Sequence, residues 1–134
     1  RDHLIFYDQD CGFCRRMLRI VIRRDQKVSR RLTSVALQDP LAARELAGYD
    51  EEERLASWHL KGPTGEVSSG GAALAPLVEI LGLPVALATF LRRHAALADG
   101  GYRWVADHRT VLGRLTRRLP DLESPVEQNR SDAQ

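Results

Sequence analysis

Hydrophobic and polar positions follow two different periods along this chain, one typical of strands and one of helices. The apolar run at 3–7 (HLIFY) predicts a buried strand, and a polar turn follows at 8–10. From residue 11 to about 24, apolar residues recur at helical spacing, which predicts an amphipathic helix. The other predicted elements are a strand within 28–37, a helix over 40–47, strands at 58–60 and 66–68, and helices over 72–81, 84–97 and 102–119.

Boundary signals separate these elements. Asp39 and Pro40 form a helix start, with Asp39 as the N-cap and Pro40 at the first helical position. A stop-and-restart signal, 82–84 (GLP), divides the two later helices, and 99–101 (DGG) predicts a break before the last one. The resulting order, β-α-β-α-β-β-α with two additional C-terminal helices, predicts the α/β three-layer sandwich of the thioredoxin-like fold.

The length indicates one domain. The chain has 134 residues, 43% of them hydrophobic, which is enough to form one hydrophobic core. We expect one domain over 1–119, its end formed by the helical extension, and a disordered polar tail over 120–134. The two cysteines do not suit a disulfide-stapled secreted scaffold, and the first apolar stretch is too short for a signal peptide. These features favour a cytoplasmic protein.

The net charge of +2 hides two basic blocks. Residues 1–31 carry nine basic and four acidic side chains, and 92–118 carry seven and two. Nucleic acid is one possible partner for such blocks. Both blocks also have helical periodicity with arginines opposite an apolar stripe, so we favour a solvated helix face and expect no nucleic-acid partner.

One segment raises the question of a membrane span. Residues 72–91 contain a single charged side chain, Glu79, over about the length that crosses a bilayer. Pro76, Gly82 and Pro84 interrupt the segment, which favours two packed helices. We therefore expect no membrane span.

The residues with the clearest chemistry are Cys11 and Cys14, in the sequence Cys11-Gly12-Phe13-Cys14. They lie where the first predicted strand meets the first predicted helix. Unpaired N–H groups and the helix dipole favour a thiolate at a helix N-terminus. Cys14 also shares the apolar stripe with Met17, so we expect it to be buried and Cys11 to be accessible. This asymmetry suits a pair of thiols that exchange with disulfides.

A CxxC pair also occurs in other kinds of site. Haem attachment requires a histidine after the second cysteine, where this chain has Arg15. A buried, inert pair is a further alternative. A structural zinc site requires two more ligands, and no pair of histidines shows ligand spacing, so we expect no metal and no other cofactor. The histidines are His3, His59, His94 and His108.

The segment 7–14 (YDQDCGFC) resembles the YDGDCxxC signature of the DCC family of thiol-disulfide oxidoreductases, with Gln9 in place of the usual glycine. Residues 57–73 resemble the family's hairpin and following helix start. Residues 102–109 are similar to its late Tyr-x-x-x-Ala-x-x-Arg segment, which ends here at Arg109. The resemblance covers about residues 3–115 and implies a thioredoxin-like fold with a redox-active CxxC.

The chain differs from thioredoxins beside the cysteines. Thioredoxins have a cis-proline just before the third strand, and the matching place near Ala56 and Ser57 has no proline. This puts substrate docking by the usual backbone pairing in question. From the residues alone, Arg109 is more typical of a surface position than of an anion clamp, and Trp58 and Trp104 are more typical of a core.

Acidic residues flank the first cysteine. Asp8 and Asp10 disfavour a thiolate at Cys11, whereas Arg15 and Arg16 favour one, and the sequence leaves the balance open. Asp10 has two alternative roles, capping the helix or accepting a thiol proton.

The sequence therefore predicts an oxidoreductase whose site residues are Cys11, Cys14 and Asp10. Cys11 attacks a disulfide of a protein or small molecule, and Cys14 resolves the mixed disulfide. A binding or redox-sensing module without turnover is the alternative, and a metal chaperone that uses the CxxC is a third.

Overall fold

Four strands form one mixed sheet in a computed structural model that describes residues 2–122. The strands are β1 (His3–Tyr7), β2 (Leu32–Ala36), β3 (His59–Lys61) and β4 (Val67–Ser69). Their order across the sheet is β2-β1-β3-β4. β1 runs parallel to β2 and antiparallel to β3, and β3 and β4 form a hairpin. This sheet, flanked by helices, is consistent with the predicted thioredoxin-like fold.

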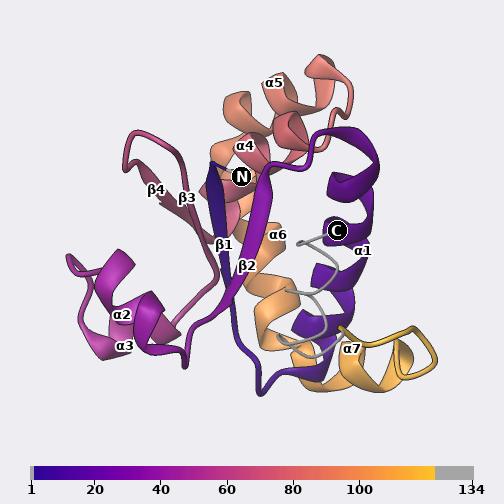
Figure 1. Ribbon diagram of the computed structural model, residues 1–134. Helices are drawn as coiled ribbons and strands as arrows, with labels where there is room; N and C mark the ends of the chain where they lie inside the picture. Colours follow the sequence, from indigo (N-terminus) through magenta and orange to yellow (C-terminus); the bar gives the residue numbers. More distant parts are fainter. Residues whose placement is uncertain (1, 123–134) are drawn as a thin grey trace.

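Helices lie on both sides of the sheet (Figure 1). α2 and α3 lie on one side, and α1 and α4 to α7 on the other. The bounds are α1 (Gly12–Val28), α2 (Pro40–Glu45), α3 (Glu51–Leu55), the 3-10 helix η1 (Gly70–Ala73), α4 (Leu74–Ile80), α5 (Val85–Arg93), α6 (Ala95–Asp107) and α7 (Arg109–Leu115).

Alternation along β1 divides the core into two clusters. Ile5 and Tyr7 pack with buried residues of α1 and α4, such as Leu18 and Leu77. Phe6 points to the opposite face, because successive side chains of a strand alternate, and packs in the cluster of β2 and α2. β1 is apolar along its length because both of its faces are buried.

A buried carboxylate closes the turn between α1 and β2. Asp25 is 1% exposed, and its carboxylate accepts hydrogen bonds from the backbone N–H groups of Arg31 (2.9 Å) and Leu32 (3.1 Å) and from the hydroxyl of Ser29 (3.1 Å). Arg30 in this turn has a φ of 52°. These bonds fix the register in which the chain returns to pair with β1.

The boundary predicted between the last two helices is wrong. The break predicted at 99–101 does not occur, because α6 continues through both glycines, and the chain breaks instead at His94 and His108. A Cβ at Gly71 would lie 2.7 Å from the backbone N and Cα of Asp99. The close packing of η1 against α6 at this point holds the helix continuous.

The acidic stretch after Gly48 forms α3, a helix that the hydrophobic pattern did not predict. Asp50 accepts a hydrogen bond from the Glu53 N–H at 2.8 Å, and the Glu53 side chain accepts one from the Asp50 N–H, which makes a capping box. The signal was present in the sequence as Asp50-x-x-Glu53.

The segment 72–91 forms parts of three short helices, η1, α4 and α5. Within residues 2–122, none of the helices has the length and apolar character that a membrane crossing requires. The core prediction for Trp104 is wrong, because its side chain is 57% exposed on α6 and stacks on the His108 ring.

The tail predicted over 120–134 falls mostly outside the described residues, which end at Leu122. Within the described part, Leu122 is partly buried and packs against the core cluster of β1 and α1.

Candidate active site

Cys11 and Cys14 lie at the start of α1, directly after the inner strand β1. The Cys11 sulfur accepts a hydrogen bond from the backbone N–H of Cys14 at 3.2 Å, so Cys11 itself is the N-cap of α1. The capping role considered for Asp10 is therefore wrong. A sulfur in this position receives the N–H group and the positive end of the helix, both of which favour a thiolate.

The two thiols differ in environment less than the sequence predicted. Both cysteines are free and half-buried, so Cys14 is not enclosed and Cys11 is not fully exposed. Burial raises the pKa of the Cys14 thiol to about 12, with a further contribution from Cys11, and Arg109 opposes this rise. Cys14 therefore stays protonated at neutral pH.

Gln38 organises the turn before Cys11. Its side-chain amide donates to the carboxylates of Asp8 (2.8 Å) and Asp10 (3.4 Å), and its carbonyl oxygen accepts from the Gln9 N–H at 3.2 Å. The Asp8 carboxylate also accepts the Asp10 N–H at 2.9 Å. Gln38 comes from the loop after β2, and its part in the site was not predicted.

Arg109 brings a positive charge to Cys14 from the start of α7. Its guanidinium lies close enough to Cys14 to lower the pKa of that thiol, and its Nη1 lies 3.8 Å from Asp8 Oδ2. Its Nε donates to the Ala106 carbonyl at 3.2 Å. The side chain is 49% exposed, as expected for a surface arginine, and it also lines the pocket that contains Cys14.

Tyr102 of α6 reaches the segment where thioredoxins place their proline. Burial raises the pKa of the Tyr102 phenol, and the nearby Trp58 amide and Ser57 side chain oppose this rise. A Cβ added at Gly70 would lie 3.3 Å from the Tyr102 ring. Tyr102 therefore packs closely against η1 and against the residues that precede β3.

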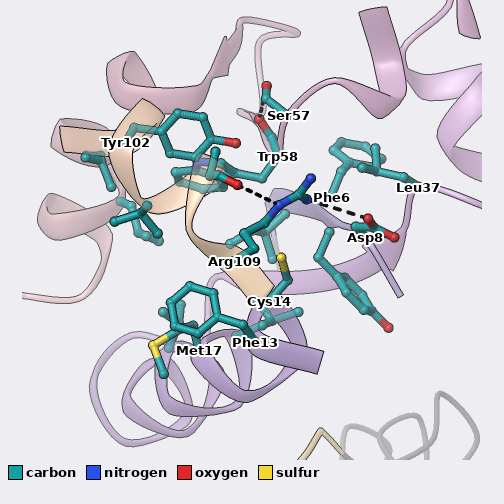
Figure 2. A pocket seen from close by; sticks show the side chains of 18 of the residues that line it. Phe6, Asp8, Phe13, Cys14, Met17, Leu37, Ser57, Trp58, Tyr102 and Arg109 are labelled. Carbon is teal, nitrogen blue, oxygen red and sulfur yellow. Dashed lines mark hydrogen bonds and ion pairs between the residues drawn. The ribbon is translucent and has the colours of Figure 1, made fainter. Parts of the chain in front are cut away.

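A pocket of about 290 Å³ opens beside Cys14. Figure 2 shows Arg109 next to Cys14, with Phe13 and Met17 of α1 on one side and Tyr102 and Trp58 on the other. Trp58 lines this pocket as well as packing against the core. The remaining lining is mostly aliphatic, including Leu37, Leu55, Leu74 and Val105.

Arginines of α1 fasten the C-terminal helices to the site. Arg16 donates to the Gly113 carbonyl at 2.8 Å and to the Thr116 hydroxyl at 3.2 Å. Arg15 binds both carboxylate oxygens of Asp121 at 3.0 Å and also donates to the Gln9 carbonyl. The solvated face expected for this part of α1 is therefore an intramolecular contact surface.

None of the four histidines lines the pocket beside Cys14. His59 is 1% exposed, and burial lowers its pKa. Its Nε2 is 2.8 Å from the Arg54 carbonyl and therefore donates, which leaves Nδ1 to accept from the Ser69 hydroxyl. In the described part of the chain, no three His, Cys, Asp or Glu side chains gather as metal ligands. The expectation of no metal stays a prediction.

A free CxxC pair at a helix N-terminus, after an inner strand of a sheet consistent with a thioredoxin-like fold, defines a protein of thiol-disulfide chemistry. The chain belongs to the DCC1-like thiol-disulfide oxidoreductase family, whose model matches residues 5–115. The resemblance noted in the sequence is thereby confirmed. No curated protein and no solved structure matches the chain.

Proposed function

We propose that this protein exchanges dithiols with disulfides through Cys11 and Cys14. The Cys11 thiolate attacks one sulfur of a substrate disulfide, forms a mixed disulfide and releases the other sulfur as a thiolate. Cys14 then loses its proton and attacks the Cys11 sulfur. The substrate gains two electrons and leaves as two thiols, and the protein is left with a Cys11–Cys14 disulfide.

The observation that carries this proposal is the hydrogen bond from the Cys14 N–H to the Cys11 sulfur at the start of α1. It favours negative charge on Cys11, whereas burial raises the pKa of Cys14 to about 12. The first attack thus falls to Cys11. The second attack by Cys14 requires a base or nearby positive charge, and Arg109 lowers its pKa.

Asp10 is the proposed acceptor of the proton that a thiol loses. Its place directly before Cys11 and its contact with Gln38 support the assignment, because they keep a carboxylate in the turn beside the sulfurs. We further propose that the protein acts in the cytoplasm, where thiols such as these two free cysteines stay reduced.

Trapping of mixed disulfides tests the proposal. Reduced Cys14→Ser protein, treated with a small disulfide at pH 7.5, should retain one covalent thiol adduct in intact-mass spectra. Cys11→Ser should form the adduct at least about tenfold more slowly, since burial, the largest cause of the raised Cys14 pKa, remains in this variant. Equal adduct formation by both variants, or adducts on Cys14 alone, would contradict the assignment of roles.

The second candidate function is a binding or redox-sensing module, favoured by the pocket and by the Tyr102 side chain, which lies close to the Trp58 amide. Steady-state reduction of a small disulfide, with dithiothreitol as the final reductant, separates the two. An oxidoreductase exceeds the double Cys11→Ser, Cys14→Ser variant, while a module without turnover matches it.

A further inference from the structure

We propose that the substrate of this site is a small-molecule disulfide with an apolar body and an anionic group, rather than an extended polypeptide. The body occupies the pocket beside Cys14, and Arg109 binds the anion. This inference rests on the proposed dithiol exchange and names the substrate class for it.

The helices α6 and α7 close the surface on which a peptide would lie. An extended peptide binds beside a strand through unpaired backbone groups. The Tyr102 side chain lies over the entrance to β3, with its hydroxyl close to the Trp58 amide and its ring against Gly70. The Trp58 carbonyl accepts hydrogen bonds from the Gly70 N–H at 3.2 Å and from the Ser57 hydroxyl at 3.1 Å. The carbonyl is therefore already engaged, and Tyr102 covers the amide against an approaching peptide.

Tyr102 is not positioned to move aside easily. Its ring lies against Gly70, and one turn earlier on α6 the backbone of Asp99 lies against Gly71. At the other end, Arg16 of α1 holds α7 through Gly113 and Thr116. The cover over the Trp58 amide is therefore anchored at two places, on η1 and on α1.

Arg109 retains hydrogen-bonding capacity that an anion can use. A guanidinium has five N–H donors, and within residues 2–122 Arg109 donates to the Ala106 carbonyl and forms an ion pair with Asp8, with Cys14 nearby. The Asp8 contact, at 3.8 Å, is longer than a hydrogen bond. Asp8 is engaged at shorter distances with Asp10 and Gln38. A carboxylate that approaches Arg109 can accept two parallel hydrogen bonds.

The pocket limits the size and polarity of the part of the substrate that does not contact Arg109. Its volume of about 290 Å³ is at the lower end for small-molecule sites, and Phe13, Met17 and Trp58 line it beside Cys14. Arg109 is its one lining side chain with a positive charge among the described residues. An apolar group placed here, with its anion on Arg109, brings an attached sulfur next to Cys14, whose N–H contacts the Cys11 sulfur.

The test compares two aromatic disulfides of similar size. One is 5,5′-dithiobis(2-nitrobenzoate), which carries carboxylates, and the other is 2,2′-dithiobis(5-nitropyridine), which is neutral. Each reacts with reduced Cys14→Ser protein, so that the first attack by Cys11 alone is measured from the coloured thiol released. Dividing each rate constant by that for free N-acetylcysteine removes intrinsic reactivity. The ratio of anionic to neutral values then measures selectivity for charge.

In this background, Arg109→Gln should lower the selectivity ratio by about tenfold, since it removes a charge-assisted contact to the anion. Arg109→Lys should keep part of it. Arg103→Gln removes an exposed charge from α6 and should leave the ratio within about twofold, which controls for general electrostatic attraction. Circular dichroism spectra of all variants check that the fold is retained.

The outcomes separate the two proposals. If Arg109→Gln slows both disulfides equally, Arg109 acts on the sulfurs alone and the substrate class is wrong, while dithiol exchange stands. A peptide with one disulfide should react at least about tenfold more slowly than the dicarboxylate after the same normalisation, and an equal rate would also overturn the inference. If neither small disulfide reacts faster with the protein than with N-acetylcysteine, dithiol exchange itself fails.

Discussion

The two helices that border the cysteine pair, α1 and α6, are attached to the molecule by different means. α1 buries an apolar stripe that includes Leu18 and Ile22 against the sheet. α6 has one buried residue, Ala98, and leaves Leu97 and Trp104 exposed. It is held instead by close backbone packing at Gly71 and by the polar contacts of Tyr102.

α1 and α6 therefore contribute to the site in different ways. The stripe of α1 fixes the cysteines relative to β1, so the reactive sulfurs depend on the main core. α6 supplies side chains that decide what reaches those sulfurs, and it depends on a few short contacts. We therefore expect substitutions in the first region to change global stability most, and those in the second to change the site with a smaller loss of stability.

The largest loss of stability is expected from a substitution in the turn between α1 and β2. Asp25→Ala removes the acceptor of two backbone N–H groups and one hydroxyl inside the protein. Unsatisfied buried donors cost about 1–3 kcal/mol each, so the free energy of unfolding should fall by about 3 kcal/mol or more. Urea denaturation measures this loss.

Asp25→Asn is the matched control, because it keeps the shape and one carbonyl oxygen for these donors. It should lose less stability than Asp25→Ala. If the alanine variant unfolds at the same urea concentration as the wild type, the carboxylate does not hold the junction.

The half of the fold around α1 was largely predictable because its signals are local. The apolar run of β1, the stripe of α1, and Asp39 with Pro40 at α2 each mark an element without reference to the rest of the chain. The continuity of α6 was not predictable in this way. Glycines at 100 and 101 are local helix breakers, whereas the packing that overrides them involves Gly71, far away in sequence.

A pair of glycine substitutions tests that explanation. Gly71→Ala places a Cβ 2.7 Å from the Asp99 backbone, so η1 and α6 must separate and the free energy of unfolding should fall by about 1–3 kcal/mol. Gly100→Ala, where no atom lies within 4 Å of the added Cβ, should raise it by about 0.5–1 kcal/mol. Thermal denaturation of both variants measures the contrast, and an equal loss in both would mean that α6 does break at its glycines.

The candidate site was predictable only in part, for a similar reason. Cys11 and Cys14 form a motif within one turn of helix, so their spacing alone revealed them. Arg109 was included in the family resemblance, yet its residue type alone indicated a surface position. Tyr102 and the pocket arise from the packing of α6 against η1 and α1, and only the family's Tyr-x-x-x-Ala-x-x-Arg segment offered a signal for them.

The smallest effect on stability is expected at the ion pair between Arg15 of α1 and Asp121, which follows α7. Arg15 holds the pKa of the Asp121 carboxyl below its usual range, so the ion pair adds stability while Asp121 is ionised. This contribution is complete above the ordinary Asp pKa of about 3.9 and is lost as the pH falls through the lower folded value. Because Asp121 is 42% exposed, solvent and salt screen the pair, and Asp121→Asn should cost under about 1 kcal/mol at pH 7. Urea midpoints of the wild type and Asp121→Asn should therefore differ slightly at pH 7 and converge near about pH 2. A constant difference across that range would show that the contact acts through packing of the 121–122 segment rather than through charge.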